Sequence, residues 1–230
     1  SMNSLLIISG AFGLFHKETV IEAGGFRHDT LGEDMELTVR LHRHLRERRR
    51  PYRITFVPDP ICWTEVPETL TGLARQRIRW QRGLSEALFW NRNLLFSARG
   101  GPPGWIGFPF FLAFEWASPI VEVLGYLFMI VGFALGIIGI PSFLLFLGVA
   151  IGLGILLSSS ALLLEEMSFH MYPRQRDVAV LFLAAILENF GYRQLNALWR
   201  LLGIVLWTIG KKSAWGEMRR SGAWARAKSG

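Results

Sequence analysis

The segment from Gln76 to Trp80 carries an amide, a guanidinium group and an indole within five residues. In an α-helix, residues three and four apart share a face, so Gln76, Arg79 and Trp80 are predicted to project together. Gly83, one turn further on, leaves that face open. An arginine holds a phosphate through two parallel hydrogen bonds, and an indole stacks on the apolar face of a sugar ring. This combination suits a nucleotide sugar or a growing glycan. In the alternative interpretation, Gln76 and Arg79 are solvated and Trp80 belongs to an apolar stripe.

A second group of candidate residues is Gly32-Glu33-Asp34, which follows a Gly24-Gly25-Phe26 turn and opens a predicted helix. Backbone N–H groups and the positive end of the helix dipole hold a carboxylate ionised at that position. An ionised carboxylate can accept the proton of a hydroxyl group that attacks a sugar carbon. The alternative is that Glu33 or Asp34 only caps the helix.

Other kinds of chemistry find little support in the composition. The single cysteine, Cys62, excludes an intramolecular disulfide and a cysteine-rich zinc site. His42 and His44 are two residues apart and therefore lie on different helix faces, so we do not expect a zinc pair. Asp34-Met35-Glu36 is only a D-x-E pattern on a helix, and no metal site is predicted from it. The arginine clusters lack interleaved aromatic residues, so nucleic acid is not an expected partner.

The second half of the chain predicts membrane helices. Hydrophobic residues make up 51% of the protein and charged residues 19%, and the 42 residues from Val123 to Leu164 contain no Lys, Arg, Asp, Glu or His. A crossing needs about 20 residues, so we predict one helix over 108–138 and a second over 142–164, with a turn between them. Glu115 and Glu122 are seven residues apart and share a face, which is expected to point to a bundle interior or to the interfacial zone. Glu115 at simple headgroup depth is the alternative.

The segment 165–177 is polar and is predicted to be a loop, and 178–210 is apolar but interrupted by polar residues. For 178–210 we favour a broken or re-entrant hairpin over one tilted crossing. The tail 211–230 carries six Lys and Arg against one Glu. The positive-inside rule places such a tail, and with a hairpin both chain ends, in the cytoplasm.

Residues 1–104 are interpreted as a soluble α/β segment that opens in mid-fold. Short strands are predicted at 5–9 and 54–57, and helices at 17–23, 33–45 and from about 69 to 96. The last of these is amphipathic and basic, so it is expected to lie along a membrane surface. The basic run Arg46–Arg50 is expected in a solvated or lipid-facing turn. The predicted fold class is therefore α/β plus membrane α-helical.

The order of the motifs carries a resemblance. The motifs are SGAFGLF (9–15), GGF (24–26), GEDMELTVRLH (32–42), TEVPETL (64–70) and QRIRW (76–80), followed by membrane helices. This order resembles the C-terminal half of membrane-embedded family 2 glycosyltransferases, such as bacterial cellulose, poly-N-acetylglucosamine and hyaluronan synthases. The resemblance covers essentially the whole chain. It implies four parts: the C-terminal part of a GT-A-type catalytic domain (1–68), an interfacial helix with QxxRW (69–104), a transmembrane region (105–210) and a cytoplasmic tail (211–230).

The resemblance also implies roles for single residues. Asp34 matches the family's catalytic base, with Glu33 beside it. The Q-x-x-R-W motif, which lines the acceptor channel and the donor pyrophosphate, matches Gln76, Arg79 and Trp80. The SGA turn lies by the acceptor terminus in such enzymes, which makes Ser9, Gly10 and Ala11 weaker candidates for substrate binding. The chain departs from the family at Gly32, where the motif has Thr or Ser.

A larger departure is that the family's N-terminal half, with its nucleotide-binding strands and a D-x-D motif for Mg²⁺ or Mn²⁺, has no counterpart in this sequence. The expected partners are therefore the missing half, a donor such as a UDP-sugar, a glycan acceptor and the lipid bilayer. Without that half, this chain is expected to bind no metal and to be inactive. The function implied is inverting sugar transfer to a growing polysaccharide, coupled to export, by a multi-pass protein of the bacterial inner membrane whose catalytic part faces the cytoplasm.

Two other functions are weighed against polysaccharide synthesis. One is a non-processive enzyme of the same family that glycosylates a lipid and uses the helices only as an anchor. The other is a non-catalytic membrane scaffold or transport subunit that kept the fold and lost its donor site. The sequence does not specify the sugar or its linkage.

Overall fold

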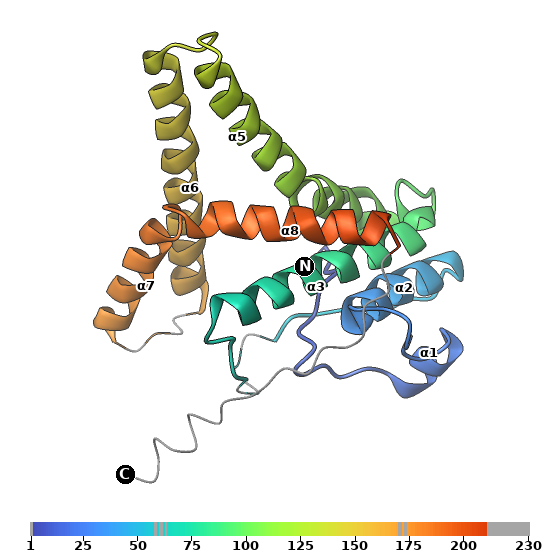
Figure 1. The fold of residues 1–230 in the computed structure, drawn as a ribbon. Coiled ribbons are helices and arrows are strands. Elements are labelled where there is room, and N and C mark those ends of the chain that lie inside the picture. The colour runs from blue at the N-terminus through green and yellow to red at the C-terminus, as the bar shows by residue number, and fades with distance from the viewer. Residues whose placement is uncertain are drawn as a thin grey trace. The chain divides into compact units, whose positions relative to one another are not determined.

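The computed structural model describes residues 2–57, 59, 62, 64–169, 172 and 174–210, and helices dominate this part of the chain (Figure 1). The α-helices are α1 (Lys17–Glu22), α2 (Glu33–Glu47), α3 (Leu70–Trp90), α4 (Phe108–Phe110), α5 (Ser118–Ala134), α6 (Ile140–Phe169), α7 (Gln175–Leu187) and α8 (Tyr192–Thr208). They form two compact units. The described residues up to Leu112 belong with 202–210 to unit 1, and Ala113–Leu201 form unit 2.

Unit 1 is built on the packing of α2 against α3 (Figure 1). The predicted leucine stripe of α2 is confirmed, because Leu37, Leu41 and Leu45 are all buried. The α3 helix begins where Thr69 caps it, since the Thr69 hydroxyl accepts a hydrogen bond from the Gly72 N–H at 3.1 Å. It ends at Trp90, and only a short 3₁₀ turn follows, so the predicted continuation to residue 96 is wrong.

The end of α8 also belongs to unit 1 and packs closely on α3. A Cβ atom added to Gly203 would lie 2.9 Å from the Ile78 carbonyl oxygen and 2.9 Å from the Gln81 Cβ. The Phe89 and Trp207 ring centroids are 4.7 Å apart. Glycine at position 203 thus permits a close helix–helix approach.

The two predicted strands are absent from the described residues, and the α/β expectation is not confirmed. Residues 5–9 and 54–57 are irregular. They are held by side chains: Asn3 donates from Nδ2 to the Tyr52 carbonyl at 3.0 Å, and its Oδ1 accepts from the Ile54 N–H at 2.8 Å. A strand requires the backbone ladder of a neighbouring strand. Here side chains supply the hydrogen bonds instead.

A buried histidine fixes the same region. His42 is fully buried, and its Nε2 donates to the Leu5 carbonyl at 2.8 Å while its Nδ1 accepts from the Tyr52 hydroxyl at 2.6 Å. Burial lowers the pKa of His42 to about 4, assisted by the positive charge of Arg46 and opposed by the hydrogen bond to Leu5. This histidine therefore has a structural role.

The first long apolar segment begins and ends earlier than the sequence predicts. It runs from Pro103 to Ala134, with π-helical turns at Pro103–Gly107 and Phe111–Trp116 on either side of α4. A turn containing Gly136 (φ +71°) leads into α6. The α6 helix continues to Phe169, so the loop predicted from residue 165 begins later, since Glu and Met sustain a helix.

The segment predicted as a broken hairpin is broken. The α7 and α8 helices meet at 64°, and Gly191, with φ +99°, lies in the break. By length and composition, Pro103–Ala134 and Ile140–Phe169 are candidate membrane spans, and the bent pair would count as a third if it were one span. The tail 211–230 lies outside the described residues.

Candidate functional site

The start of α2 touches α3 backbone to backbone. A Cβ atom on Gly83 would lie 2.8 Å from the Gly32 N and 2.9 Å from its Cα, distances that a real side chain does not tolerate. The departure at Gly32 therefore has a steric explanation: this helix crossing has little room for a Thr or Ser side chain. Since Gly83 lies three and four residues after Trp80 and Arg79, α2 begins on the face of α3 that carries the QxxRW motif.

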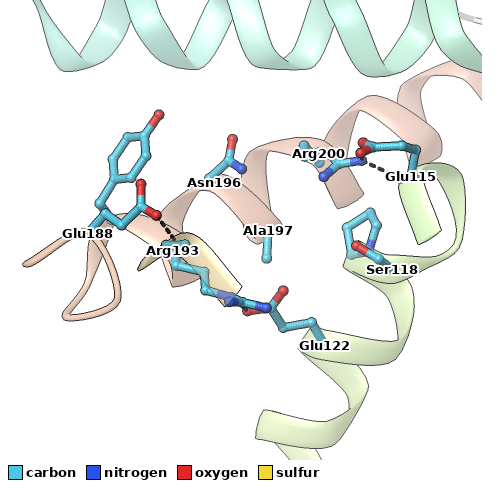
Figure 2. A pocket seen from close by; sticks show the side chains of 11 residues that line it. Glu115, Ser118, Glu122, Glu188, Arg193, Asn196, Ala197 and Arg200 are labelled. Atoms are coloured by element: carbon cyan, nitrogen blue, oxygen red, sulfur yellow. Dashed lines mark hydrogen bonds and ion pairs between the residues drawn. The ribbon is translucent and has the colours of Figure 1, made fainter. Parts of the chain in front are cut away.

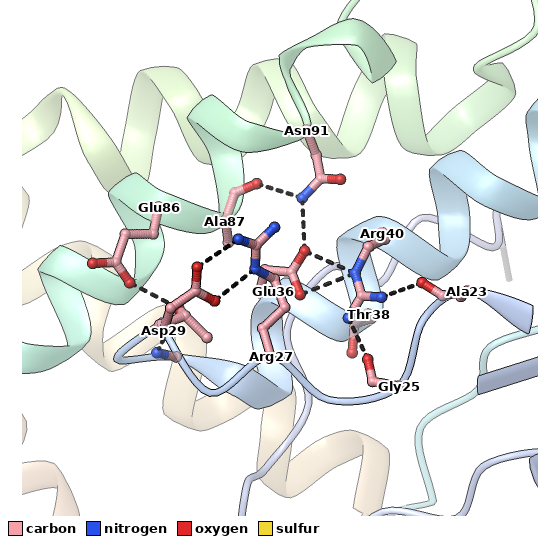
Figure 3. Close-up of polar contacts among 12 residues, drawn as sticks. Ala23, Gly25, Arg27, Asp29, Glu36, Thr38, Arg40, Glu86, Ala87 and Asn91 are labelled. Atoms are coloured by element: carbon pink, nitrogen blue, oxygen red, sulfur yellow. Dashed lines mark hydrogen bonds and ion pairs between the residues drawn. The ribbon is translucent and has the colours of Figure 1, made fainter. Parts of the chain in front are cut away.

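A buried carboxylate on α3 holds the loop that leads into α2 (Figure 3). Glu86 is 8% exposed, and its Oε2 accepts hydrogen bonds from the Thr30 hydroxyl at 2.7 Å and from the Leu31 N–H at 2.9 Å. The Thr30 Oγ1 accepts in turn from the Gly32 N–H at 3.2 Å. Glu86 was not among the residues predicted from the sequence. The signal for it is an acidic residue one turn after Gly83, within the apolar part of α3.

A second buried network fixes the Gly24-Gly25 turn (Figure 3). Arg40 donates from Nε to the Glu36 carboxylate at 2.9 and 3.1 Å, and its two terminal nitrogens donate to the carbonyl oxygens of Ala23 and Gly25. Both glycines of the turn have positive φ, +96° and +73°. The predicted turn is confirmed, and the arginine that holds it comes from the middle of α2.

Asp34 and Gly10, two predicted site residues, lie against each other. A Cβ on Gly10 would be 2.7 Å from the Asp34 Oδ2, so a side chain at position 10 would force that carboxylate oxygen to move. The other oxygen of Asp34 accepts from the Met35 N–H at 2.7 Å. Asp34 is partly buried and lies in the first turn of α2. The flanking Ser9 and Ala11 are exposed.

The QxxRW residues occupy neighbouring positions on α3. Gln76 and Arg79 are partly buried, whereas Trp80 is 50% exposed. The Arg77 guanidinium carbon lies 4.8 Å from the centre of the Trp80 ring, a cation–π contact that was not predicted from the sequence. One face of the indole is therefore occupied within the chain, and the opposite face is the one available for stacking. The polar cavity of unit 2 and a small hollow lined by Arg43 and Arg99 do not include Gln76, Arg79 or Trp80.

Unit 2 contains a polar cavity of about 440 Å³ (Figure 2). Its lining includes two salt bridges between α8 and the segment 115–122: Arg193 Nε to Glu122 Oε1 at 3.2 Å, and Arg200 Nη2 to Glu115 Oε2 at 3.0 Å. Glu115 and Glu122 are seven residues apart, and so are Arg193 and Arg200, so the two salt bridges lie two helical turns apart along the same pair of segments. We call these two salt bridges the charge ladder. Glu115 and Glu122, predicted to face a bundle interior or the interfacial zone, both pair with arginines of α8. These arginine partners were not predicted from the sequence.

A third carboxylate faces this cavity from the break between α7 and α8. Glu188 accepts a hydrogen bond from the Ser158 hydroxyl on α6 at 2.6 Å. The remaining lining residues are Ser118, Pro119, Tyr192, Asn196 and Ala197. Charged and hydroxyl groups therefore line a hollow in a unit whose outer side chains are largely apolar. Such a lining suits a hydroxyl-rich ligand better than an apolar one.

A metal site does not emerge from the described residues, among which no group of three or more His, Cys, Asp or Glu side chains is arranged to hold a metal ion. The two carboxylates of the D-x-E sequence at Asp34–Glu36 do not act together, since the Glu36 carboxylate is paired with Arg40. The described residues therefore do not fit the Mg²⁺ or Mn²⁺ that the resemblance implies.

Comparison with known proteins adds two findings. The family model described as "Glycosyl transferase family group 2" matches residues 1–164. Poly-beta-1,6-N-acetyl-D-glucosamine synthase of Staphylococcus aureus strain COL is 43% identical over 81 residues, or 35% of this chain and 18% of that protein. The synthase of that name from Staphylococcus epidermidis is 38% identical over 87 residues, or 36% of this chain and 20% of that protein. The matched part thus spans about a fifth of these relatives. No solved structure matches the chain.

Proposed function

Because the chain belongs to glycosyl transferase family group 2, we propose that it is the acceptor-side part of a membrane enzyme that lengthens a polysaccharide from a nucleotide-sugar donor. The similarity to poly-beta-1,6-N-acetyl-D-glucosamine synthases supports a polysaccharide as the product. The apolar segments 103–134 and 140–169 support a location in a membrane, with the inner membrane of a bacterium as the proposed site.

In the proposed reaction Asp34 is the general base. The acceptor hydroxyl oxygen attacks the anomeric carbon, the bond from that carbon to the donor phosphate breaks, the nucleoside diphosphate leaves, and the hydroxyl proton passes to the Asp34 carboxylate. A single displacement of this kind inverts the configuration at the sugar. Arg79 and Gln76 hold the departing pyrophosphate, and Trp80 stacks on the acceptor sugar. Glu33 lies beside the base, and the Ser9-Gly10-Ala11 turn lies near the acceptor end.

One observation carries the proposal more than any other: the contacts that join the three motifs. Gly10 of the first motif leaves room for the Asp34 carboxylate, and Gly32 of the second rests on Gly83 beside the third. Motifs separated by tens of residues are thus held together by positions that have little or no space for a Cβ atom. A scaffold that had lost its catalytic function would not need to keep the Asp34 carboxylate in such close surroundings.

The cavity of unit 2 supports a coupled export step. A growing glycan is rich in hydroxyl groups, which carboxylates and guanidinium groups bind well. Ladder residues Glu122 and Arg193 would offer such groups within an otherwise apolar unit. We propose that the cavity receives product on its way through the membrane.

Donor binding is proposed to depend on a partner segment. The described residues supply no metal-ligand cluster, so the nucleotide and its Mg²⁺ or Mn²⁺ would be held by a donor-binding half that completes the catalytic domain. We expect the 230-residue chain alone to transfer no sugar from a UDP-sugar. Measurable synthesis by the isolated chain would overturn this part of the proposal.

The central test is Asp34→Asn in the native polypeptide that contains this chain. Asn retains an oxygen that can accept from the Met35 N–H, so the fold should persist. We expect the rate of sugar incorporation to fall by about 100-fold or more, with the KM for the donor nearly unchanged. Asp29→Asn is the matched control: Asp29 is an exposed carboxylate paired with Arg27, and its loss should leave transfer unchanged. Full activity of Asp34→Asn would eliminate Asp34 as the base.

The length of the product separates polysaccharide synthesis from transfer of one sugar to a lipid. We expect radiolabelled donor to give long, glycosidase-sensitive chains. A labelled lipid carrying one sugar would instead favour the anchored lipid glycosyltransferase.

A further inference from the structure

A small basic hollow lies in unit 1 just before the first apolar segment, and we call it the arginine notch. It is lined by Arg43, Arg46, Glu47, Asn93, Leu94, Ser97, Arg99 and Gly100, and its volume is about 10 Å³. Three arginines face one carboxylate there, so the notch has a net positive charge. The QxxRW motif and Asp34 are not part of it, and its function does not depend on the catalytic proposal.

Two of the arginines show that the notch is shaped for an acceptor. Arg46 is fixed: its Nε donates to the Tyr52 hydroxyl at 3.3 Å, and a Cβ on Gly101 would lie only 2.7 Å from its guanidinium carbon. Gly101 has φ +56°, a conformation that suits glycine. The Arg43 Nε, in contrast, is buried without a hydrogen-bond partner in the described chain. A buried donor in that condition is costly, and an acceptor from outside the chain would satisfy it.

The surroundings of the notch place it at the surface of a bilayer. The apolar segment begins at Pro103, four residues after Arg99. Trp105 is 55% exposed, and its indole N–H donates to the carbonyl oxygen of Ser97, a notch residue, at 2.9 Å. Phe96 packs on the same indole with ring centroids 5.2 Å apart. An exposed tryptophan at the end of an apolar segment is typical of headgroup depth.

We propose that the arginine notch binds the phosphate of an anionic lipid headgroup. Guanidinium groups bind phosphate oxygens in pairs, and basic residues next to a membrane segment attract anionic lipids. The volume admits about one oxygen-sized group, so a phosphate oxygen would enter while the rest of the lipid remains in the bilayer. The Glu47 carboxylate at the notch disfavours highly charged phosphates and suits a phosphodiester with one negative charge.

The test uses the protein in detergent with added phosphatidylglycerol, and native mass spectrometry counts the bound lipid. We expect Arg43→Gln combined with Arg99→Gln to weaken phosphatidylglycerol binding by about tenfold or more. The matched control is Arg48→Gln combined with Arg49→Gln, which removes the same charge from exposed arginines outside the notch and should weaken binding less than twofold. Phosphatidylcholine should bind weakly to all variants.

Three results would overturn the proposal. Equal losses in the two double variants would mean that general positive charge, not the notch, attracts the lipid. Inorganic phosphate that displaces phosphatidylglycerol at equal concentration would identify a free phosphate as the ligand. Undiminished binding by Arg99→Gln, an exposed position whose change should not disturb folding, would exclude the notch even if the double variant fails to fold; we expect that single change to weaken binding about threefold.

Discussion

The α2–α3 junction of unit 1 and the charge ladder of unit 2 both place carboxylates between helices, but they use them differently. At the junction, Glu86 binds a hydroxyl and a backbone N–H and so fixes a loop. In unit 2, Glu115 and Glu122 pair with arginines and so connect two helical segments. At the junction, the backbones of the two helices approach closely because Gly32 and Gly83 meet there. In the ladder, by contrast, the salt-bridged side chains line a cavity.

The difference goes with the kind of side chain that each unit exposes. Unit 2 exposes large apolar side chains along α5 and α6, as expected for helices in contact with lipid, so its charged groups must satisfy one another inside. Unit 1 buries leucines between α2 and α3, and its internal carboxylates bind groups that hold loops in place. Similar side chains therefore stabilise a local geometry in one unit and helix pairing in the other.

The largest expected effect is at Glu86. Glu86→Ala leaves the Thr30 hydroxyl and the Leu31 N–H buried without an acceptor, and we expect a loss of about 4 kcal/mol in the free energy of unfolding. Denaturant titration in detergent measures it. Glu86→Gln keeps one acceptor oxygen and should lose about half as much. Wild-type stability for Glu86→Ala would contradict the role assigned to this carboxylate.

The second prediction concerns pH and His42. Its pKa of about 4 in the folded protein is below the value of about 6.5 in the unfolded chain, so the unfolded state binds more protons between these values. Stability contributed by neutral His42 is complete above about pH 6.5 and is lost as the pH falls toward 4, about 3 kcal/mol in total.

Thermal unfolding of unit 1 between pH 7 and 4.5 tests this window. His42→Asn should lower stability at pH 7 and flatten its pH dependence. An unchanged slope in the variant would assign the titration to another group.

A third change compares two glycines. Gly83→Ala forces a Cβ into the Gly32 backbone, and we expect a loss of about 2 kcal/mol together with slower sugar transfer. Gly148→Ala in α6 is the control, because a Cβ there has open space and alanine favours a helix. Circular dichroism melts in detergent compare them. Equal stability of the two variants would mean that the junction is looser than described.

The smallest effect is expected in the ladder. Glu122 and Arg193 have side chains that are 20% and 41% exposed, so a double-mutant cycle with Glu122→Gln and Arg193→Gln should give a coupling energy of about 1 kcal/mol. Unfolding midpoints in detergent supply the four values. A coupling energy of zero would reduce the ladder to two independent polar contacts.

Much of the helical structure was predictable because local patterns determine it. The leucine spacing in α2, the glycine turn at Gly24-Gly25, the uncharged run from Val123 to Leu164 and the break near Gly191 are each visible within one segment. The predicted strands failed because a strand depends on partners elsewhere in the chain. Asn3 and His42 take the place of those partners. No sequence pattern within residues 5–9 or 54–57 predicts these contacts.

For the candidate site, the amino-acid sequence alone determined which chemical groups are available: the Asp34 carboxylate at a helix start and the amide, guanidinium and indole on one helix face. Only the tertiary structure decided that Gly10 lies on Asp34 and that Gly32 lies on Gly83. It also decided that Glu86 holds the loop that leads into α2. The physical reason is that helix periodicity acts over three or four residues, whereas these contacts join residues tens of positions apart, where packing and buried hydrogen bonds select the partners.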